Sequence, residues 1–152
     1  MRTEQPKVIH LKDYQAPDYL IDETHLKFEL FEDHSLVHAE LKLRRNPERG
    51  AGLPPLLLHG QQLELLALEL DGQALGADDY QLDDEQLGVQ PRQAEFVLRS
   101  TVRIHPESNT ALEGLYKSGK MFCTQCEAEG FRKITYYLDR PDVMSRFTTT
   151  VS

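Results

Sequence analysis

The chain has 152 residues, of which 39% are apolar and 28% are charged, and its formal net charge is −8. That length suits one domain with a real core, and the acidic balance disfavours a uniformly basic face, so no nucleic-acid partner is expected. The acidity serves either solubility or attraction for a cationic ligand. No apolar run approaches the ~18 residues of a membrane helix, and the N-terminus lacks the apolar core of a secretion signal. With two cysteines and no signal, we expect a cytoplasmic protein with no membrane partner.

The first half of the sequence predicts an extended entry segment followed by a hairpin. Residues 13–19 are expected to be extended, because residues before a proline such as Pro17 avoid the helical region. Apolar and polar residues then alternate over 25–30 and again over 37–44, with a short polar link at 32–35. This pattern predicts two antiparallel strands with one buried face and one solvated face.

Further short strands are predicted at regular spacing. Residues 56–58 suit a buried strand, and the turn dipeptide Asp71-Gly72 favours strand over helix for the leucine-rich stretch 65–70. Residues 87–89 and 94–105 complete a set of six or seven strands at about ten-residue spacing. The predicted fold class is therefore all-β, an antiparallel β-sandwich or saddle-shaped sheet.

The C-terminal residues carry two further expectations. Asp139 as N-cap and Pro141 in the first turn predict a short C-terminal helix over 141–147. Residues 147–152 resemble the start of a strand with no partner after it, which suggests a fragment of a longer protein.

The stretch 109–142 concentrates the candidate chemistry. Cys123 and Cys126 have Cys-x-x-Cys spacing, but a structural zinc site needs four ligands and no second pair exists. A redox motif would need a helix N-terminus to lower the thiol pKa, and the residues before the pair are not capping residues. Ordinary reduced cysteines are favoured over metal or redox use. The six histidines show no ligand spacing, so we expect no metal site in this chain.

An acidic run follows the cysteines directly. Glu127-Ala128-Glu129 is either a solvated loop or a carboxylate site for a cationic group such as an ammonium. Gln125 could line the same pocket with its amide. No His-Glu-x-x-His, no Gly-x-Ser-x-Gly and no phosphate loop occurs anywhere, so we expect no catalytic residue in this chain.

Three segments resemble one known family. They read Asn-Thr-Ala-Leu-Glu-Gly-Leu-Tyr (109–116), Cys-Thr-Gln-Cys-Glu-Ala-Glu-Gly-Phe-Arg (123–132) and Ile-Thr-Tyr-Tyr-Leu-Asp-Arg-Pro-Asp-Val (134–143), with Arg-Phe-Thr-Thr at 146–149. These segments resemble the bacterial aminopeptidase N family of zinc metallo-aminopeptidases. The early segment 13–19 resembles the opening of that family as well. The match is dense over the last forty or so residues and loose between about 20 and 105.

The resemblance implies that residues 1–152 are the N-terminal β domain of a longer zinc aminopeptidase, packed against a catalytic domain that is not in this chain. It implies that Glu127 binds the free α-amino group of a peptide substrate and that Gln125 contributes to the pocket for the first side chain. The zinc motif lies outside this chain, so the fragment alone is expected to bind no zinc and to be inactive. The alternative is a free-standing β-sandwich adaptor that binds a protein partner and has no enzymatic role.

Overall fold

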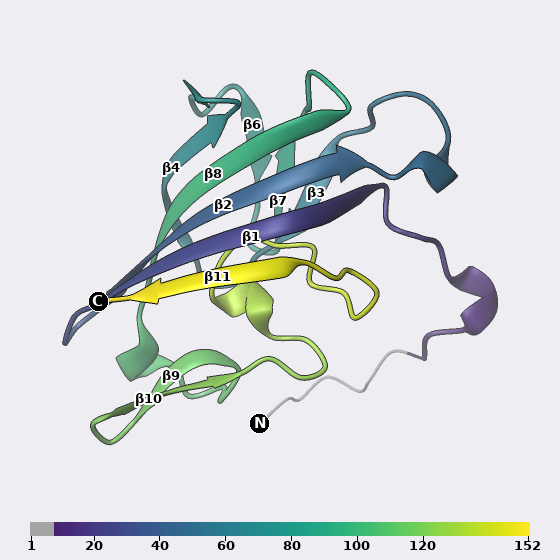
Figure 1. Ribbon diagram of the computed structural model, residues 1–152. Helices are drawn as coiled ribbons and strands as arrows, with labels where there is room; N and C mark the ends of the chain where they lie inside the picture. The colour runs from purple at the N-terminus through teal and green to yellow at the C-terminus, as the bar shows by residue number, and fades with distance from the viewer. Residues whose placement is uncertain (1–7) are drawn as a thin grey trace.

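The computed structural model describes residues 8–152, which form two layers of β structure (Figure 1). The part of the N-terminal segment that contains Pro6 lies outside the described residues. The strands are β1 (Tyr19–Leu30), β2 (Ser35–Arg45), β3 (Leu56–His59), β4 (Glu64–Leu70), β5 (Gln73–Ala74), β6 (Tyr80–Leu82), β7 (Gln86–Val89), β8 (Glu95–Ile104), β9 (Gly114–Ser118), β10 (Met121–Gln125) and β11 (Arg146–Val151).

The helices in the described part of the chain are short. They are four 3-10 turns, η1 (Leu11–Asp13), η2 (Pro47–Arg49), η3 (Pro106–Ser108) and η4 (Phe131–Lys133). None of the helices found in residues 8–152 is long and apolar enough to cross a membrane.

The largest layer is a six-stranded sheet in the order β11-β1-β2-β8-β4-β5. β1 and β2 pair in antiparallel register, with Leu26 opposite Ala39, and β2 pairs with β8 in the same way. Apart from one β-bulge between Ile21 and Glu23 in β1, the alternation in these strands places every second side chain on one face. The predicted hairpin and the all-β fold class are therefore confirmed.

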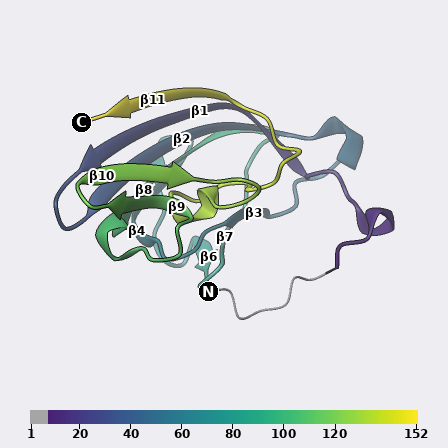
Figure 2. The ribbon, with the colours of Figure 1, turned by 90° about the horizontal axis from the view of Figure 1, so that it is seen from below.

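The core lies between the large sheet and the smaller elements. A three-stranded sheet of order β3-β7-β6 and the buried segment 134–138 cover the apolar face of the large sheet (Figure 2). The two layers share a single cluster of buried side chains, in which Leu58 and Leu87 pack with residues of β2 and β8 such as Leu41. Burying a side chain of this size contributes about 1.5–3 kcal/mol.

The expected helix over 141–147 is not present. The chain turns there instead, and β11 begins at Arg146. Asp139, the expected N-cap, directs its carboxylate back to the N–H groups of Gly130 and Arg132. One oxygen of this carboxylate is therefore already bound to the loop that precedes it, and the residues after it form a turn and not a helix.

Strand β11 confirms the strand expected near residues 147–152, but its partner precedes it in the chain. It pairs with β1 in parallel register, from Glu23 opposite Arg146 to Phe28 opposite Val151. Parallel neighbours need a long crossover connection, which here is the whole chain between the two strands. Sequence periodicity shows that a strand exists but not which strand it joins, so this pairing was not predicted.

Two neighbouring leucines can be used to test which face of β3 is buried against the core. Leu58 is 0% exposed and Leu57 is 50% exposed. We expect Leu58→Ala to lower the free energy of unfolding by about 2–5 kcal/mol, because it leaves a cavity in the core. Leu57→Ala, the matched control, should change it by less than about 1 kcal/mol. Chemical denaturation of both variants measures the difference, and equal losses would contradict the two-layer packing.

Candidate functional site

The loop between β10 and η4 carries both residues that the sequence singled out. Gln125 is the last residue of β10, and Glu127 lies in the bend that follows it. Both residues are exposed, and within the described part of the chain neither side chain has a hydrogen-bond or ion-pair partner. The structure therefore places the amide and the carboxylate on one short loop, both open to solvent.

The neighbouring glutamate differs from Glu127 in one respect. The carboxylate of Glu129 lies 3.0 Å from Nη2 of Arg132, an ion pair within the loop itself. Glu129 thus already has a cationic partner, whereas the carboxylate of Glu127 has none among the described residues. The sequence could not separate the two, because the pairing depends on how the chain folds back at η4.

The base of this loop is held by buried groups. The carboxylate of Asp139, whose residue is 7% exposed, accepts hydrogen bonds from the backbone N–H groups of Gly130 and Arg132 and from Nε of Arg132. On the other side, Gly114 has φ +74, and a Cβ there would lie 2.6 Å from Cβ of Lys133. Only glycine fits that position without displacing the loop.

A half-buried histidine that sequence reasoning missed also supports the loop. Nδ1 of His59 accepts a hydrogen bond of 3.2 Å from the backbone N–H of Asp139. Burial, followed by the nearby Arg132 guanidinium, lowers the pKa of His59, which favours the neutral ring that can accept this bond. No spacing pattern in the sequence links residues so far apart.

The two cysteines are free thiols. Cys123 and Cys126 are both half-buried, and burial raises the pKa of the Cys126 thiol. A raised pKa keeps the thiol protonated, which disfavours nucleophilic or metal-binding use. No group of three or more His, Cys, Asp or Glu side chains among residues 8–152 could hold a metal ion, so the residues described do not fit a zinc centre.

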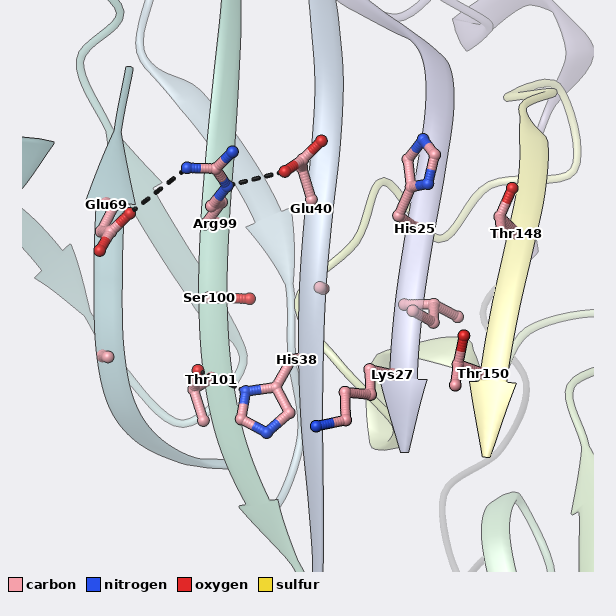
Figure 3. A pocket seen from close by; sticks show the side chains of 13 residues that line it. His25, Lys27, His38, Glu40, Glu69, Arg99, Ser100, Thr101, Thr148 and Thr150 are labelled. Atoms are coloured by element: carbon pink, nitrogen blue, oxygen red, sulfur yellow. Dashed lines mark hydrogen bonds and ion pairs between the residues drawn. The ribbon is translucent and has the colours of Figure 1, made fainter. Parts of the chain in front are cut away.

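The solvated face of the large sheet forms a second, broader surface. It contains an open hollow of about 380 Å³ that crosses β11, β1, β2, β8 and β4 (Figure 3). Its charged side chains pair with each other across the strands. Nε of Arg99 lies 2.7 Å from Glu40, and Nε2 of His38 lies 2.6 Å from Glu29. Such cross-strand pairs stabilise the sheet and leave these carboxylates already engaged.

At the end of this face, three basic side chains contact one carboxylate. Glu23 lies 2.7 Å from Nζ of Lys42, 2.8 Å from Nη2 of Arg146 and 3.2 Å from Nε2 of His25. The hydrogen bonds from Lys42 and then His25 lower the pKa of the Glu23 carboxyl from 4.5 to about 2. The cluster joins three adjacent strands, β11, β1 and β2.

This lowered pKa predicts a pH-dependent contribution to stability. Since the pKa of Glu23 is lower in the folded state, its stabilising effect is present above about pH 4.5 and is lost as the pH falls towards about 2. We expect Glu23→Gln to be less stable than the wild type at neutral pH, with a difference that shrinks through this window. Chemical denaturation at several pH values measures it, and high salt should reduce the neutral-pH difference. A difference that does not vary with pH would contradict the assignment.

Comparison with known proteins agrees with this architecture. A family model described as the Peptidase M1 N-terminal domain matches residues 25–152. The chain is 46% identical to the aminopeptidase N of Caulobacter vibrioides over 151 residues, which is 99% of this chain and 17% of that protein.

Two solved structures share the fold. One is Legionella pneumophila aminopeptidase A in complex with aspartic acid, with TM-score 0.86 and 27% identity over 93% of this chain and 17% of that one. The other is an M1 zinc metallopeptidase of Deinococcus radiodurans, with TM-score 0.69 and 17% identity over 88% of this chain and 32% of that one.

The chain therefore belongs to the family of M1 peptidase N-terminal domains. This confirms the resemblance seen in the sequence. The chain spans about a sixth of the length of the curated relative described above, 17% of that protein. The roles of Glu127 and Gln125 stay predictions.

Proposed function

We propose that residues 1–152 are the N-terminal β domain of a longer cytoplasmic zinc aminopeptidase, which releases N-terminal amino acids from peptides. Membership of the M1 N-terminal domain family supports this proposal, as does the similarity to an aminopeptidase N over almost the whole chain. In this division of labour, the domain supplies contacts to the substrate and a catalytic domain of the same protein supplies the chemistry.

The observation that carries the proposal is the unpaired carboxylate of Glu127. An exopeptidase must distinguish a free α-ammonium from an internal peptide bond, and a carboxylate does so by a charge-assisted hydrogen bond. Glu127 suits this role because it is exposed and has no partner among the described residues, whereas Glu129 is already paired with Arg132. Gln125, two residues earlier, would contact the first side chain of the substrate.

Zinc would be held by the catalytic domain, since residues 8–152 offer no cluster of ligands for it. When bound there, zinc polarises a scissile carbonyl and activates water. The contribution of this chain is to bind and orient the amino terminus of the peptide.

Several exposed apolar side chains suit contact with the rest of such a protein. Phe147 and Val151 project from the edge strand β11, and Met121 lies at the tip of the β9–β10 hairpin. Exposed apolar side chains of this kind are common at interaction surfaces. We propose that this side of the domain faces the catalytic domain.

The role of Glu127 can be tested in the full-length aminopeptidase that carries this domain. We expect Glu127→Gln to raise KM for substrates with a free α-amine, with a loss of about 1–3 kcal/mol as for a missing charged hydrogen bond. Glu129→Gln, the matched control, should have a smaller effect because its carboxylate is already paired with Arg132. Steady-state kinetics measures both, and unchanged kinetics for Glu127→Gln would remove it from the site.

The assignment of the chemistry to the catalytic domain leads to a second prediction. The purified 152-residue chain should release no amino acid from peptides, with or without added zinc, because the groups that hold the metal would lie in the catalytic domain. Incubation with an amino-acyl p-nitroanilide measures this directly. Turnover that copurifies with the chain and is abolished by a chelator would show that the chain is an enzyme by itself.

A further inference from the structure

An ion pair between the buried Asp139 and Arg132 restrains the loop that carries Glu127. The carboxylate of Asp139 lies 3.1 Å from the N–H nitrogen of Gly130 and 3.2 Å from that of Arg132. It lies 2.8 Å from Nε of Arg132, whose Nη2 also donates to the carbonyl of Asp139. One carboxylate thus restrains the backbone at the point where the loop enters η4.

This ion pair is connected to the core of the domain. The backbone N–H of Asp139 donates to Nδ1 of His59. His59 and Tyr137 exchange two backbone hydrogen bonds, of 2.8 and 3.1 Å, which join the segment to β3. The position of Asp139 is therefore set by a buried strand and not by the solvent-exposed loop.

The β9–β10 hairpin also packs closely against both ends of the loop. Gly114 pairs with Gln125 across β9 and β10. A Cβ at Gly130 would lie 2.9 Å from the carbonyl oxygen of Gln125 and 3.5 Å from the backbone nitrogen of Gly114. Three backbone segments thus meet at Gly130, and a side chain there would displace the backbone of Gln125.

We propose that Asp139 and Arg132 form a positioning pair. The pair determines the position of the Glu127 carboxylate and thereby the affinity for the substrate α-amine. Neither residue is assigned a contact with the substrate. This inference rests on the proposed function, because it takes Glu127 as the group that binds the amine. The ion pair between Arg132 and the exposed Glu129 adds little to this positioning, since exposed ion pairs are weak.

A purely structural buried pair would behave differently from a positioning pair. Loss of a structural pair lowers the thermal stability of the enzyme but leaves the kinetics of the folded molecules unchanged. Loss of a positioning pair raises KM in molecules that remain folded, because a carboxylate displaced by about 1 Å binds its target poorly. The split between KM and kcat therefore separates the two roles.

The test uses the full-length aminopeptidase and an amino-acyl p-nitroanilide with a free α-amine. Asp139→Asn should raise KM by about tenfold and change kcat by less than about threefold. Backbone hydrogen exchange of the segment 126–132 should become faster, because two N–H groups lose their charged acceptor. Asp142→Asn is the matched control, since Asp142 also pairs with an arginine, Arg140, at 2.7 Å but does not contact the loop.

A double-mutant cycle then links the pair to Glu127. In the Glu127→Gln background, Asp139→Asn should raise KM by no more than about twofold, because the group that it positions is already neutral. Should Asp139→Asn prevent folding, Arg132→Lys serves instead. Lysine keeps the charge but cannot hold the fork of contacts that the guanidinium makes, so KM should still rise.

The outcomes separate the two proposals. If Glu127→Gln raises KM while Asp139→Asn in folded enzyme leaves it unchanged, or if the two effects multiply fully, the positioning role is overturned and the proposed function stands. If Glu127→Gln leaves KM unchanged, the proposed role of Glu127 in binding the amine fails, and with it the link from Asp139 to the amine. Unchanged hydrogen exchange over 126–132 in Asp139→Asn would overturn the positioning role by itself.

Discussion

The buried carboxylate of Asp139 links the core of this domain to the exposed loop that carries Glu127. A buried charge is costly unless it is paired and hydrogen-bonded, and here three N–H donors satisfy it. Those donors come from the loop, while the segment that carries Asp139 is anchored to β3 through His59. The geometry at Glu127 therefore depends on core packing that is remote in the sequence.

The two faces of the large sheet differ in how their groups are satisfied. The inner face is apolar and buries its side chains against β3, β7 and the segment 134–138. The outer face is charged, and its acidic groups are neutralised by bases on neighbouring strands, as Glu23 and Glu40 show. Within the described residues, Glu127 differs from both, since its carboxylate is exposed and unpaired. Other carboxylates such as those of Asp84 and Glu85 are exposed as well, so the sequence resemblance over 123–132, together with the free carboxylate, points to this loop as a candidate binding site for a cation.

Much of the fold could be predicted because period-2 alternation is a local property. The hairpin of β1 and β2, the strand β8 and the strand β4 all follow from alternation and turn residues. The expected helix over 141–147 was wrong because a capping residue was assigned from its type alone. Asp139 has the chemistry of an N-cap, but its carboxylate is engaged by the loop that precedes it. Local patterns cannot reveal such a competing partner.

The sequence by itself determined the all-β class, the residues that alternate towards the core, the family, and the loop on which Gln125 and Glu127 lie. These features depend on residue types and short spacings. Only the tertiary structure decided that β11 joins β1 in parallel, that Glu129 is paired while Glu127 is not, and that Asp139 and His59 support the loop. Each of these depends on contacts between residues brought together by folding, because pairing and burial are properties of the packed chain.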